Sequence, residues 1–360
     1  MFFRDDLLEK EKVNVKVPHK KNMLCLNENP LNPLKFIEND FFTILKNEVD
    51  LNRYFSTITK ELEDKLCAYV GFGLDKKNFI YGNGADEMLY YLFTAVKDNN
   101  AFALSLSPSY FDYKSYSGAV GLNIVFQSLN NEFDFDEDKF LSKLNNVNCK
   151  LGILCNPNNP TGNLLDYEKI EYIIRNTDKL ILVDETYYEF SNLTFADKIK
   201  DYDNLVIIRS FSKSFAAAGV RFGYLLSNNN NIREIEKVKT VFNMSLLIQA
   251  FIVSILNNLG RFKDNIEKII NMRQELFESL NSRDGIIAKP SYTNFLIFSI
   301  GENTKLLFDY LAENDFALRD IGNHPVLENF IRVSIGTKKQ NCELIKLIDN
   351  FFKEYVENKG

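Results

Sequence analysis

The residues with the clearest chemical potential lie in one short stretch, 210–221, which reads SFSKSFAAAGVR. It places Lys213 between two serines, ends on Arg221, and directly follows an apolar run at 205–208 that is typical of a buried strand. A lysine amine can form a Schiff base with a carbonyl group, whereas serine hydroxyls and a guanidinium can hold a phosphate. Pyridoxal 5'-phosphate (PLP) offers both groups. A surface lysine at the start of a helix is the alternative for this stretch taken alone.

A second stretch with chemical potential is a glycine-rich turn at 81–87, which reads YGNGADE. Apolar residues recur at helical spacing over 88–96, so the turn leads into an amphipathic helix. The first turn of a helix carries unpaired backbone N–H groups at the positive end of the helix dipole, and this end can bind an anion. The alternative is that Asp86 and Glu87 only favour the first helical turn.

The elements that must position these residues are apolar runs typical of buried strands. They lie at 101–106, 151–154, 180–183, 205–208 and 223–227. Helix-like segments such as 167–175 alternate with them, which predicts a mostly parallel sheet covered by helices on both faces. Ligands of such sheets bind beyond the carboxyl ends of the strands, so we expect one sheet edge to hold the site. The polar residues just past the strand ends are Tyr110, Asn159, Asp184, Tyr187, Ser210 and Lys213.

The pattern changes after about residue 240, which predicts a second, smaller domain. Helical spacing covers 245–258, 262–282, 304–314 and the tail from 344 to 355, and strand-like runs occupy 293–300, 317–319 and 330–334. The predicted fold class is therefore α/β, with a large domain over residues 28–240. We expect residues 1–27 to form an N-terminal arm that joins a small α+β domain over 241–360.

Composition and charge exclude several classes of protein. Of the 360 residues, 45% are hydrophobic and 26% are charged, as in ordinary soluble globular proteins. The net charge of −6 and the pI near 5.3 argue against binding to nucleic acid or to an anionic membrane. The five cysteines are scattered without a CxxC pair, and His19 and His324 are the only histidines, so we expect reduced thiols and no metal site. Neither a signal peptide nor a membrane span is evident, and we expect a soluble, cytoplasmic protein.

Six motifs, taken in order, resemble the fold type I PLP-dependent aminotransferases of class I and II. They are GNGADE (82–87), SPSY (107–110), NPNNPTG (156–162), VDETY (183–187), SFSKSFAAAGVRFGY (210–224) and IRVSIGT (331–337). The likeness is strongest to the histidinol-phosphate aminotransferase branch, to which LNENP (26–30) and NRY (52–54) also point. It runs from about residue 24 to residue 340. The resemblance implies a large PLP-binding domain with a mostly parallel sheet and a smaller α+β domain.

The resemblance also implies catalytic roles. Lys213 would hold PLP as the internal aldimine and then move a proton as general base and acid. Asp184 would keep the pyridine nitrogen protonated. Tyr187 and Asn159 would donate hydrogen bonds to the phenolic oxygen, and Tyr110 would stack on the ring. The alternatives are a metal-binding carboxylate for Asp184, which no phosphate-binding GxxxxGK[ST] loop supports, a simple turn for Asn159 and a core position for Tyr110.

Contacts to the two phosphates follow from the same resemblance. The PLP phosphate would lie among Gly84, Ala85, Asp86, Ser210, Ser212 and Arg221. Tyr54 would reach it from a second subunit, which implies a homodimer. The substrate would contact Asn29, Arg319 and Arg332, with Arg332 clamping its anionic group and Arg319 close by.

The N-terminal arm departs from the branch, which usually carries a tyrosine there in a motif like RPY. Here residues 17–21 read VPHKK, the first tyrosine is Tyr54, and Phe55 follows it where the branch has proline. His19, Lys20 or Lys21 is a candidate replacement for the missing phosphate contact, and a solvated basic run is the alternative.

The predicted reaction is the transfer of an amino group between L-glutamate (with 2-oxoglutarate as its keto partner) and a small phosphorylated carbonyl compound. Histidinol phosphate is the first candidate substrate. Another phosphorylated ketone or amine, such as the pair of dihydroxyacetone phosphate and serinol phosphate, fits the same motifs. So does a PLP decarboxylase of a phosphorylated amino acid. A third hypothesis is a non-catalytic regulatory protein of this fold, which the intact set of lysine, aspartate, tyrosine and arginine disfavours.

Overall fold

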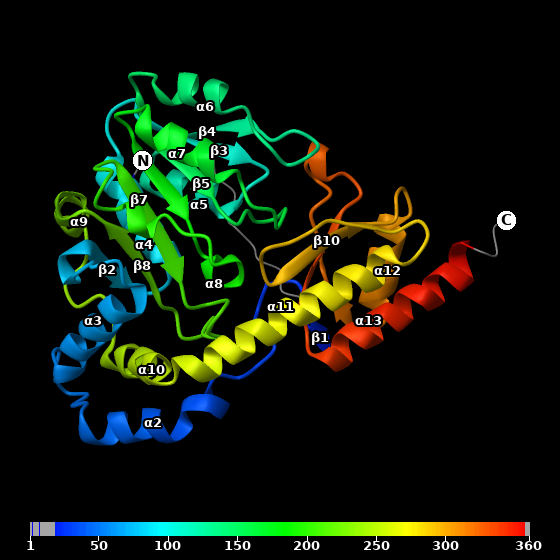
Figure 1. The fold of residues 1–360 in the computed structure, drawn as a ribbon, viewed down its shortest axis with the longest axis horizontal. Coiled ribbons are helices and arrows are strands. Elements are labelled where there is room, and N and C mark those ends of the chain that lie inside the picture. The colour runs from blue at the N-terminus through cyan, green and yellow to red at the C-terminus, as the bar shows by residue number, and fades with distance from the viewer. Residues whose placement is uncertain (1, 3–6, 8–18, 357–360) are drawn as a thin grey trace.

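The computed structural model describes residues 2, 7 and 19–356 and places the expected site on a seven-stranded sheet (Figure 1). The strands, in their order across the sheet, are β2 (Phe79–Gly82), β8 (Gly223–Ser227), β7 (Leu205–Ser210), β6 (Leu180–Asp184), β5 (Cys149–Cys155), β3 (Phe102–Ser107) and β4 (Asn123–Ser128). The pairs from β7 through β6, β5 and β3 to β4 are parallel. The prediction of a mostly parallel sheet is therefore confirmed.

Strand β8 is the exception, because it runs antiparallel to both β7 and β2. A parallel return to a neighbouring strand needs a crossover, usually a helix. The connection from β7 to β8 contains no helix and carries the lysine stretch instead, so the chain turns back along its neighbour. The sequence interpretation did not include β2 and β4. Strand β2 has only four residues, and β4 lies at the sheet edge with only Gln127 buried, so neither shows the long apolar run of the central strands.

Helices cover both faces of this sheet, and their bounds follow the apolar spacing. They are α2 (Leu34–Asn47), α3 (Thr57–Val70), α4 (Ala85–Val96), α5 (Asp112–Val120), α6 (Glu137–Leu144), α7 (Tyr167–Arg175), α8 (Tyr188–Ser191), α9 (Asn229–Glu236) and α10 (Leu246–Asn257), with the 3₁₀ turns η1 (Lys76–Asn78) and η2 (Ala196–Lys198). Along β7, Val206 and Ile208 face the core formed with α4, α5 and α9, whereas Leu205 and Ile207 face the opposite core. A strand buried on both faces has no polar alternation, which explains its continuous apolar run.

A smaller body is built around a second, antiparallel sheet with the order β12–β13–β10–β9. Its elements are α11 (Leu259–Asn281), β9 (Ile287–Ala288), β10 (Phe295–Ser299), α12 (Thr304–Glu313), β12 (Arg319–Asp320), β13 (Ile331–Ser334), α13 (Lys338–Phe351) and the π-helical turn η4 (Phe352–Val356). The 3₁₀ turn η3 (Pro325–Leu327) lies in the connection from β12 to β13. Strands β1 (Asn22–Met23) and β11 (Phe316–Ala317) pair separately. The run expected at 317–319 is thus divided between two sheets at Leu318.

Figure 1 shows the long helix α11 running from α10, beside the large sheet, to the small body. Helix α10 itself packs on α2 and α3, and its apolar residues share a core with the large sheet. The division at residue 240 stays a prediction, and we propose that α10 belongs with the large domain. Within residues 2, 7 and 19–356, no helix has both the length and the apolar character needed to cross a bilayer.

Candidate active site

A cavity of about 700 Å³ opens at the carboxyl ends of the parallel strands and is bounded on its other side by β12 and β13. It collects most of the residues that the sequence analysis selected: Ala85, Asp86, Tyr110, Asn159, Asp184, Tyr187, Ser210, Ser212, Lys213, Arg221, Arg319 and Arg332. Gly84 borders the cavity through its neighbour Ala85, whereas Tyr54 and Asn29 do not line it.

Lys213 lies on the segment between β7 and β8, and its Nζ atom donates a 2.9 Å hydrogen bond to the carbonyl oxygen of Leu26. Burial, together with the nearby guanidinium of Arg332, lowers the pKa of Lys213 to about 8. A neutral carbonyl partner does not favour the protonated amine as a carboxylate would. About a tenth of the amine is therefore neutral at pH 7, far more than for an ordinary lysine, and only the neutral form is a nucleophile.

Asn29 contacts the backbone of the segment that carries Lys213. Its Nδ2 atom lies 3.3 Å from the carbonyl oxygens of both Lys213 and Ser214. Its Oδ1 atom accepts from the backbone N–H of Leu31 at 3.1 Å and from Asn265 Nδ2 at 3.4 Å. The structure thus places Asn29 against the backbone of the lysine segment rather than in the cavity, where the sequence analysis expected a substrate contact.

Asp184 ends β6 at the floor of the cavity and is held by three hydrogen bonds. Tyr113 donates to its Oδ2 atom at 2.5 Å, and Thr186 donates to Oδ1 from its hydroxyl at 2.6 Å and from its backbone N–H at 3.0 Å. Burial raises the pKa of Asp184, while these donors oppose the rise. The sequence analysis missed Tyr113 and Thr186. Their positions in the sequence could have indicated them. Tyr113 comes three residues after Tyr110, at the start of a helix, and Thr186 comes soon after the end of a strand.

Tyr187 and Asn159 are oriented by residues of other elements. Asn27 donates from Nδ2 to the Tyr187 oxygen at 2.8 Å, so the phenol's own proton remains for another acceptor. Arg332 donates to Oδ1 of Asn159 at 2.6 Å, which leaves the Asn159 amide nitrogen as a donor on the cavity wall. Burial raises the pKa of the Tyr187 phenol and keeps it protonated. The role of Asn27 was not anticipated, although it lies within the LNENP motif.

The start of α4 forms one end of the cavity and carries the features of an anion site. Its N-cap, Gly84, has a φ of +89° and provides no side-chain cap for the first N–H groups, which include those of Ala85 and Asp86. A Cβ atom at Gly84 would lie 2.6 Å from an Arg221 guanidinium nitrogen. A Cβ atom at Gly223 would lie 2.3 Å from the Ala85 backbone nitrogen. Both glycines are therefore needed for the close approach of Arg221 and β8 to this helix end.

The hydroxyls of Ser210 and Ser212 complete that end, with their Oγ atoms 3.0 Å apart. Arg221 donates to Oδ2 of Asp86 at 2.7 Å, and the two side chains are roughly two-fifths exposed. Tyr110 lies beside them, because its hydroxyl is 3.4 Å from Asp86 Oδ1. The helix end, the two hydroxyls and the guanidinium form a single cup of hydrogen-bond donors.

The opposite end of the cavity carries two arginines on adjacent strands of the small sheet. Arg319 on β12 and Arg332 on β13 are directly paired in register. Arg332 donates to the Cys25 carbonyl at 3.0 Å, and its Nε atom is buried without a hydrogen-bond partner in the described part of the chain. Arg319 lies over the Phe111 ring at 5.6 Å. Burial and the charge of Arg319 lower the pKa of Arg332. Two adjacent guanidinium groups and an unpartnered buried N–H favour a dianionic ligand.

The structure does not bring Tyr54 to the cavity of its own chain. Tyr54 is 76% exposed and stacks on Phe242, with ring centroids 4.6 Å apart. Neither His19 nor Lys20 lines the cavity. Residues 17 and 18 of the arm lie outside the described residues.

A buried ion pair beneath the floor was not anticipated. Arg209 and Glu185 are each 1% exposed, and their shortest nitrogen–oxygen distance is 2.8 Å. Arg209 also donates to the Thr194 hydroxyl at 2.6 Å and lies over the Tyr188 ring at 3.8 Å. Glu185 follows Asp184 directly, and Arg209 precedes Ser210. The pair therefore joins the ends of β6 and β7 next to two cavity residues.

Comparison with known proteins shows what this arrangement is similar to. The family model for "Aminotransferase class I and II" matches residues 20–348. The chain is 32% identical over 332 residues to the histidinol-phosphate aminotransferase of Caldanaerobacter subterraneus subsp. tengcongensis, covering 92% of this chain and 93% of that protein. It is 31% identical over 355 residues to that of Clostridium novyi, covering 99% and 98%. A solved structure of the histidinol-phosphate aminotransferase of Sinorhizobium meliloti in complex with PLP matches with a TM-score of 0.86 at 21% identity, covering 97% of this chain and 98% of that chain.

Proposed function

The chain belongs to the aminotransferase class I and II family, and we propose that within this family it is a histidinol-phosphate aminotransferase. The family resemblance inferred from the motifs is confirmed, and the protein is a PLP-dependent aminotransferase. The observation that carries the choice of substrate is the pair Arg319 and Arg332, which faces the cavity of Lys213 from the small sheet. We infer that the pair binds the phosphate of the substrate while the substrate amine reaches Lys213.

The residues of the cavity fit PLP at both of its reactive ends. The cup at the start of α4 keeps Arg221 against the helix end because Gly84 lacks a Cβ atom, and Lys213 presents an amine with a lowered pKa deeper in the cavity. We assign the cofactor phosphate to Ala85, Asp86, Ser210, Ser212 and Arg221. When bound, PLP supplies an electron-withdrawing ring that accepts the electrons of the bond broken at the substrate α-carbon.

The protein residues then have separate tasks. Lys213 would hold the cofactor through its amine and would carry the proton at the substrate α-carbon. Asp184, buried and held by Tyr113 and Thr186, would keep the ring nitrogen protonated. The donors on Tyr187 and Asn159 would hold the phenolic oxygen, with their directions set by Asn27 and Arg332. Tyr110 would cover the ring.

L-glutamate is the proposed amino donor, with 2-oxoglutarate as its product. Its carboxylate and the substrate phosphate would use the same arginines, since both are anions with oxygens that accept paired N–H donors. A cytoplasmic location stays a prediction, as does replacement of the arm tyrosine by His19, Lys20 or Lys21.

We also propose that the active form is a homodimer in which Tyr54 serves the site of the partner. The support is an apolar surface around the stacked Tyr54 and Phe242, which includes Phe55 at 68% exposure and Val241 at 80% exposure. Adjoining exposed aromatic and aliphatic side chains of this kind mark protein–protein interfaces.

The dimer is tested by mixing two inactive variants, Tyr54→Ala and Lys213→Ala, under conditions that exchange subunits. If Tyr54 acts across the interface, a mixed dimer has one site with both defects and one intact site, so activity returns. If Tyr54 acts within its own chain, every site in a mixed dimer keeps one defect and no activity returns. Sedimentation of the wild-type protein measures the oligomeric state independently.

The substrate is tested by the visible spectrum of the purified holoenzyme before and after L-histidinol phosphate is added without an amino acceptor. We expect the band of the lysine-bound cofactor to give way to the spectrum of the aminated cofactor. An unchanged band rejects histidinol phosphate but leaves the family assignment intact. Release of carbon dioxide from a phosphorylated amino acid, with no requirement for a 2-oxo acid, would establish the decarboxylase alternative instead.

A further inference from the structure

The connection between β12 and β13, residues 321–330, leaves the small sheet and packs on the large domain. Leu327 is 1% exposed and belongs to the apolar core of the large sheet. The ring of Phe330 meets that of Phe133 edge-on, with centroids 6.4 Å apart. The two arginines that face the cavity stand immediately outside the ends of this connection, at 319 and 332. Its docking therefore bears directly on where they lie.

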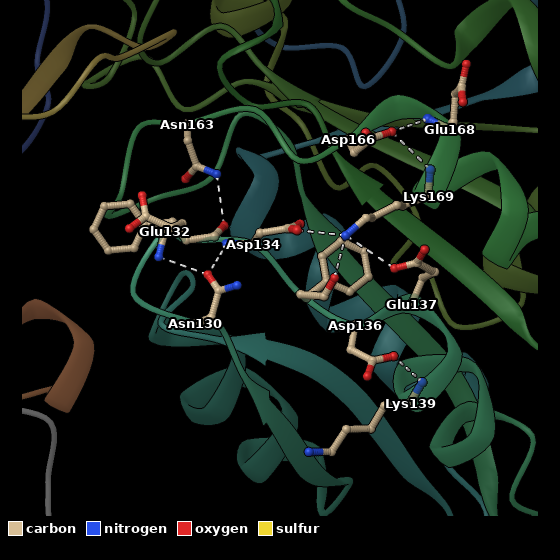
Figure 2. A network of polar contacts seen from close by, with 12 residues as sticks. Asn130, Glu132, Asp134, Asp136, Glu137, Lys139, Asn163, Asp166, Glu168 and Lys169 are labelled. Carbon is tan, nitrogen blue, oxygen red and sulfur yellow. Dashed lines mark hydrogen bonds and ion pairs between the residues drawn. The ribbon is translucent and has the colours of Figure 1, made fainter.

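The surface that receives the connection is held by a polar network on the large domain (Figure 2). Lys169 reaches Asp134 at 2.7 Å and Glu137 at 3.2 Å, and it also donates to the Phe135 carbonyl. Asn163 donates to the Phe133 carbonyl at 3.1 Å. These contacts hold the backbone on both sides of Phe133 in place. The connection between β12 and β13 therefore packs on a part of the large domain that hydrogen bonds and ion pairs stabilise.

His324 makes a polar contact between the connection and the large domain. Its Nε2 atom lies 3.0 Å from the hydroxyl of Ser107, and its Nδ1 atom accepts from the backbone N–H of Val326 at 3.4 Å. Because Nδ1 is an acceptor, the proton of the neutral imidazole is on Nε2, which donates to Ser107. Burial lowers the pKa of His324, which favours this neutral form.

Ser107 is the last residue of β3, three residues before Tyr110 on the cavity wall. The hydrogen bond from His324 thus joins the strand end that leads to the cofactor side of the cavity with the connection that carries both arginines. We propose that His324 is a positioning residue, which sets Arg319 and Arg332 at the distance from the large domain that a phosphorylated substrate requires. This inference rests on the proposed phosphate-binding role of the two arginines.

The two ring nitrogens of His324 make different contacts, Nε2 with Ser107 and Nδ1 with the Val326 N–H. Two substitutions distinguish these contacts. His324→Asn retains a side-chain oxygen that caps the Val326 N–H but is too short to reach Ser107. His324→Gln retains a donor at the reach of Nε2. If the bridge to Ser107 positions the arginines, His324→Asn raises the KM for the phosphorylated substrate about fivefold with little change in kcat, as expected for one lost hydrogen bond. His324→Gln then restores most of the loss.

Ser107→Ala removes the other partner of the bridge and should reproduce the effect of His324→Asn. The double variant should be no worse than either single variant, because both remove the same contact. The matched control is Asn323→Ala, on the same connection, where the side chain is exposed and has no hydrogen bond in the described part of the chain. Melting temperatures of all variants show whether the fold is retained.

Binding of inorganic phosphate to the holoenzyme, measured by calorimetry, gives a readout independent of substrate identity. With the cofactor phosphate in place, added phosphate reports on the two arginines, and the same fivefold loss is expected in His324→Asn and Ser107→Ala. If histidinol phosphate is not turned over but these variants still weaken phosphate binding, the proposed substrate fails and the positioning role stands. The role is overturned if the wild-type protein binds no phosphate, if His324→Asn and Ser107→Ala match Asn323→Ala, or if His324→Gln is the defective variant, since that would assign the histidine only to the turn.

Discussion

Arg332 on the small sheet donates a 2.6 Å hydrogen bond to Oδ1 of Asn159 on the large domain, 173 positions away in the chain. This contact joins the arginine end of the cavity to the wall that the large domain provides. The guanidinium proposed to bind the substrate anion also determines which way the Asn159 amide nitrogen points, and that nitrogen is the proposed donor to the cofactor. We therefore expect binding of the substrate and tuning of the cofactor to be coupled through this side-chain pair.

Replacement of Arg332 by lysine should weaken both functions while keeping the charge. An ammonium group lacks the planar fork that reaches Asn159, the Cys25 carbonyl and an anion at once. Loss of a hydrogen bond to a charged group weakens binding by about 1.5–3 kcal/mol, so we expect the KM for the phosphorylated substrate to rise about 10- to 100-fold. Steady-state kinetics measure this, with Arg175→Lys on an exposed helix position as the control. An unchanged KM would remove Arg332 from the substrate site.

Replacement of Lys213 by alanine should abolish turnover without loss of the fold. The alanine variant has no amine to hold the cofactor carbon or to move the proton. We expect the absorbance band of the lysine-bound cofactor to vanish, while the circular dichroism spectrum is unchanged. Lys237→Ala, an exposed position whose lysine pairs only with Glu234 in the described part of the chain, is the control and should retain activity. Retained turnover in Lys213→Ala would refute the assignment of the site.

The stability of the cofactor-free protein should depend on pH through Lys213. Its pKa is lowered to about 8 in the fold, whereas an unfolded lysine titrates near 10.5. Between these values the unfolded chain binds a proton that the folded chain does not, so the free energy of unfolding rises with pH across that window. In Lys213→Met this contribution is absent. Urea unfolding from pH 7.5 to 10.5 compares the two proteins, and parallel pH curves would contradict the lowered pKa.

Removal of one member of the buried pair Arg209 and Glu185 should destabilise the protein strongly. Arg209→Met leaves the Glu185 carboxylate buried without its cation, a change that typically costs about 3–5 kcal/mol. Joint replacement by Arg209→Met and Glu185→Leu should recover part of that loss, because the Glu185 carboxylate that lost its partner is then removed as well. Urea unfolding at one protein concentration provides the measurement. A loss below about 1 kcal/mol in Arg209→Met would show that the pair contributes little.

The outline of the fold was readable from the sequence because its signals are local. Strands such as β7 are buried on both faces and so read as continuous apolar runs, and helices such as α7 have one apolar face at helical spacing. The antiparallel direction of β8 was not readable, since it depends on which neighbour the strand meets after the lysine segment. The edge strands β2 and β4 were also missed, because neither shows the long continuous apolar run of the central strands.

The candidate site also has one part that the sequence indicates and one part that only the structure shows. The sequence by itself determined that Lys213, Asp184 and Asn159 follow the ends of strands, because parallel strands bring their carboxyl ends to one edge. Only the tertiary structure decided that Tyr113 holds Asp184, that Arg332 holds Asn159, and that Asn29 supports the lysine backbone instead of facing the substrate. The physical reason is that a hydrogen bond requires two atoms within about 3 Å of each other. When the two residues are far apart in the chain, no periodic pattern in the sequence indicates that they will meet. That these side chains share a cavity could be inferred from their places after strand ends, but which of them touch depended on how the chain packs in three dimensions.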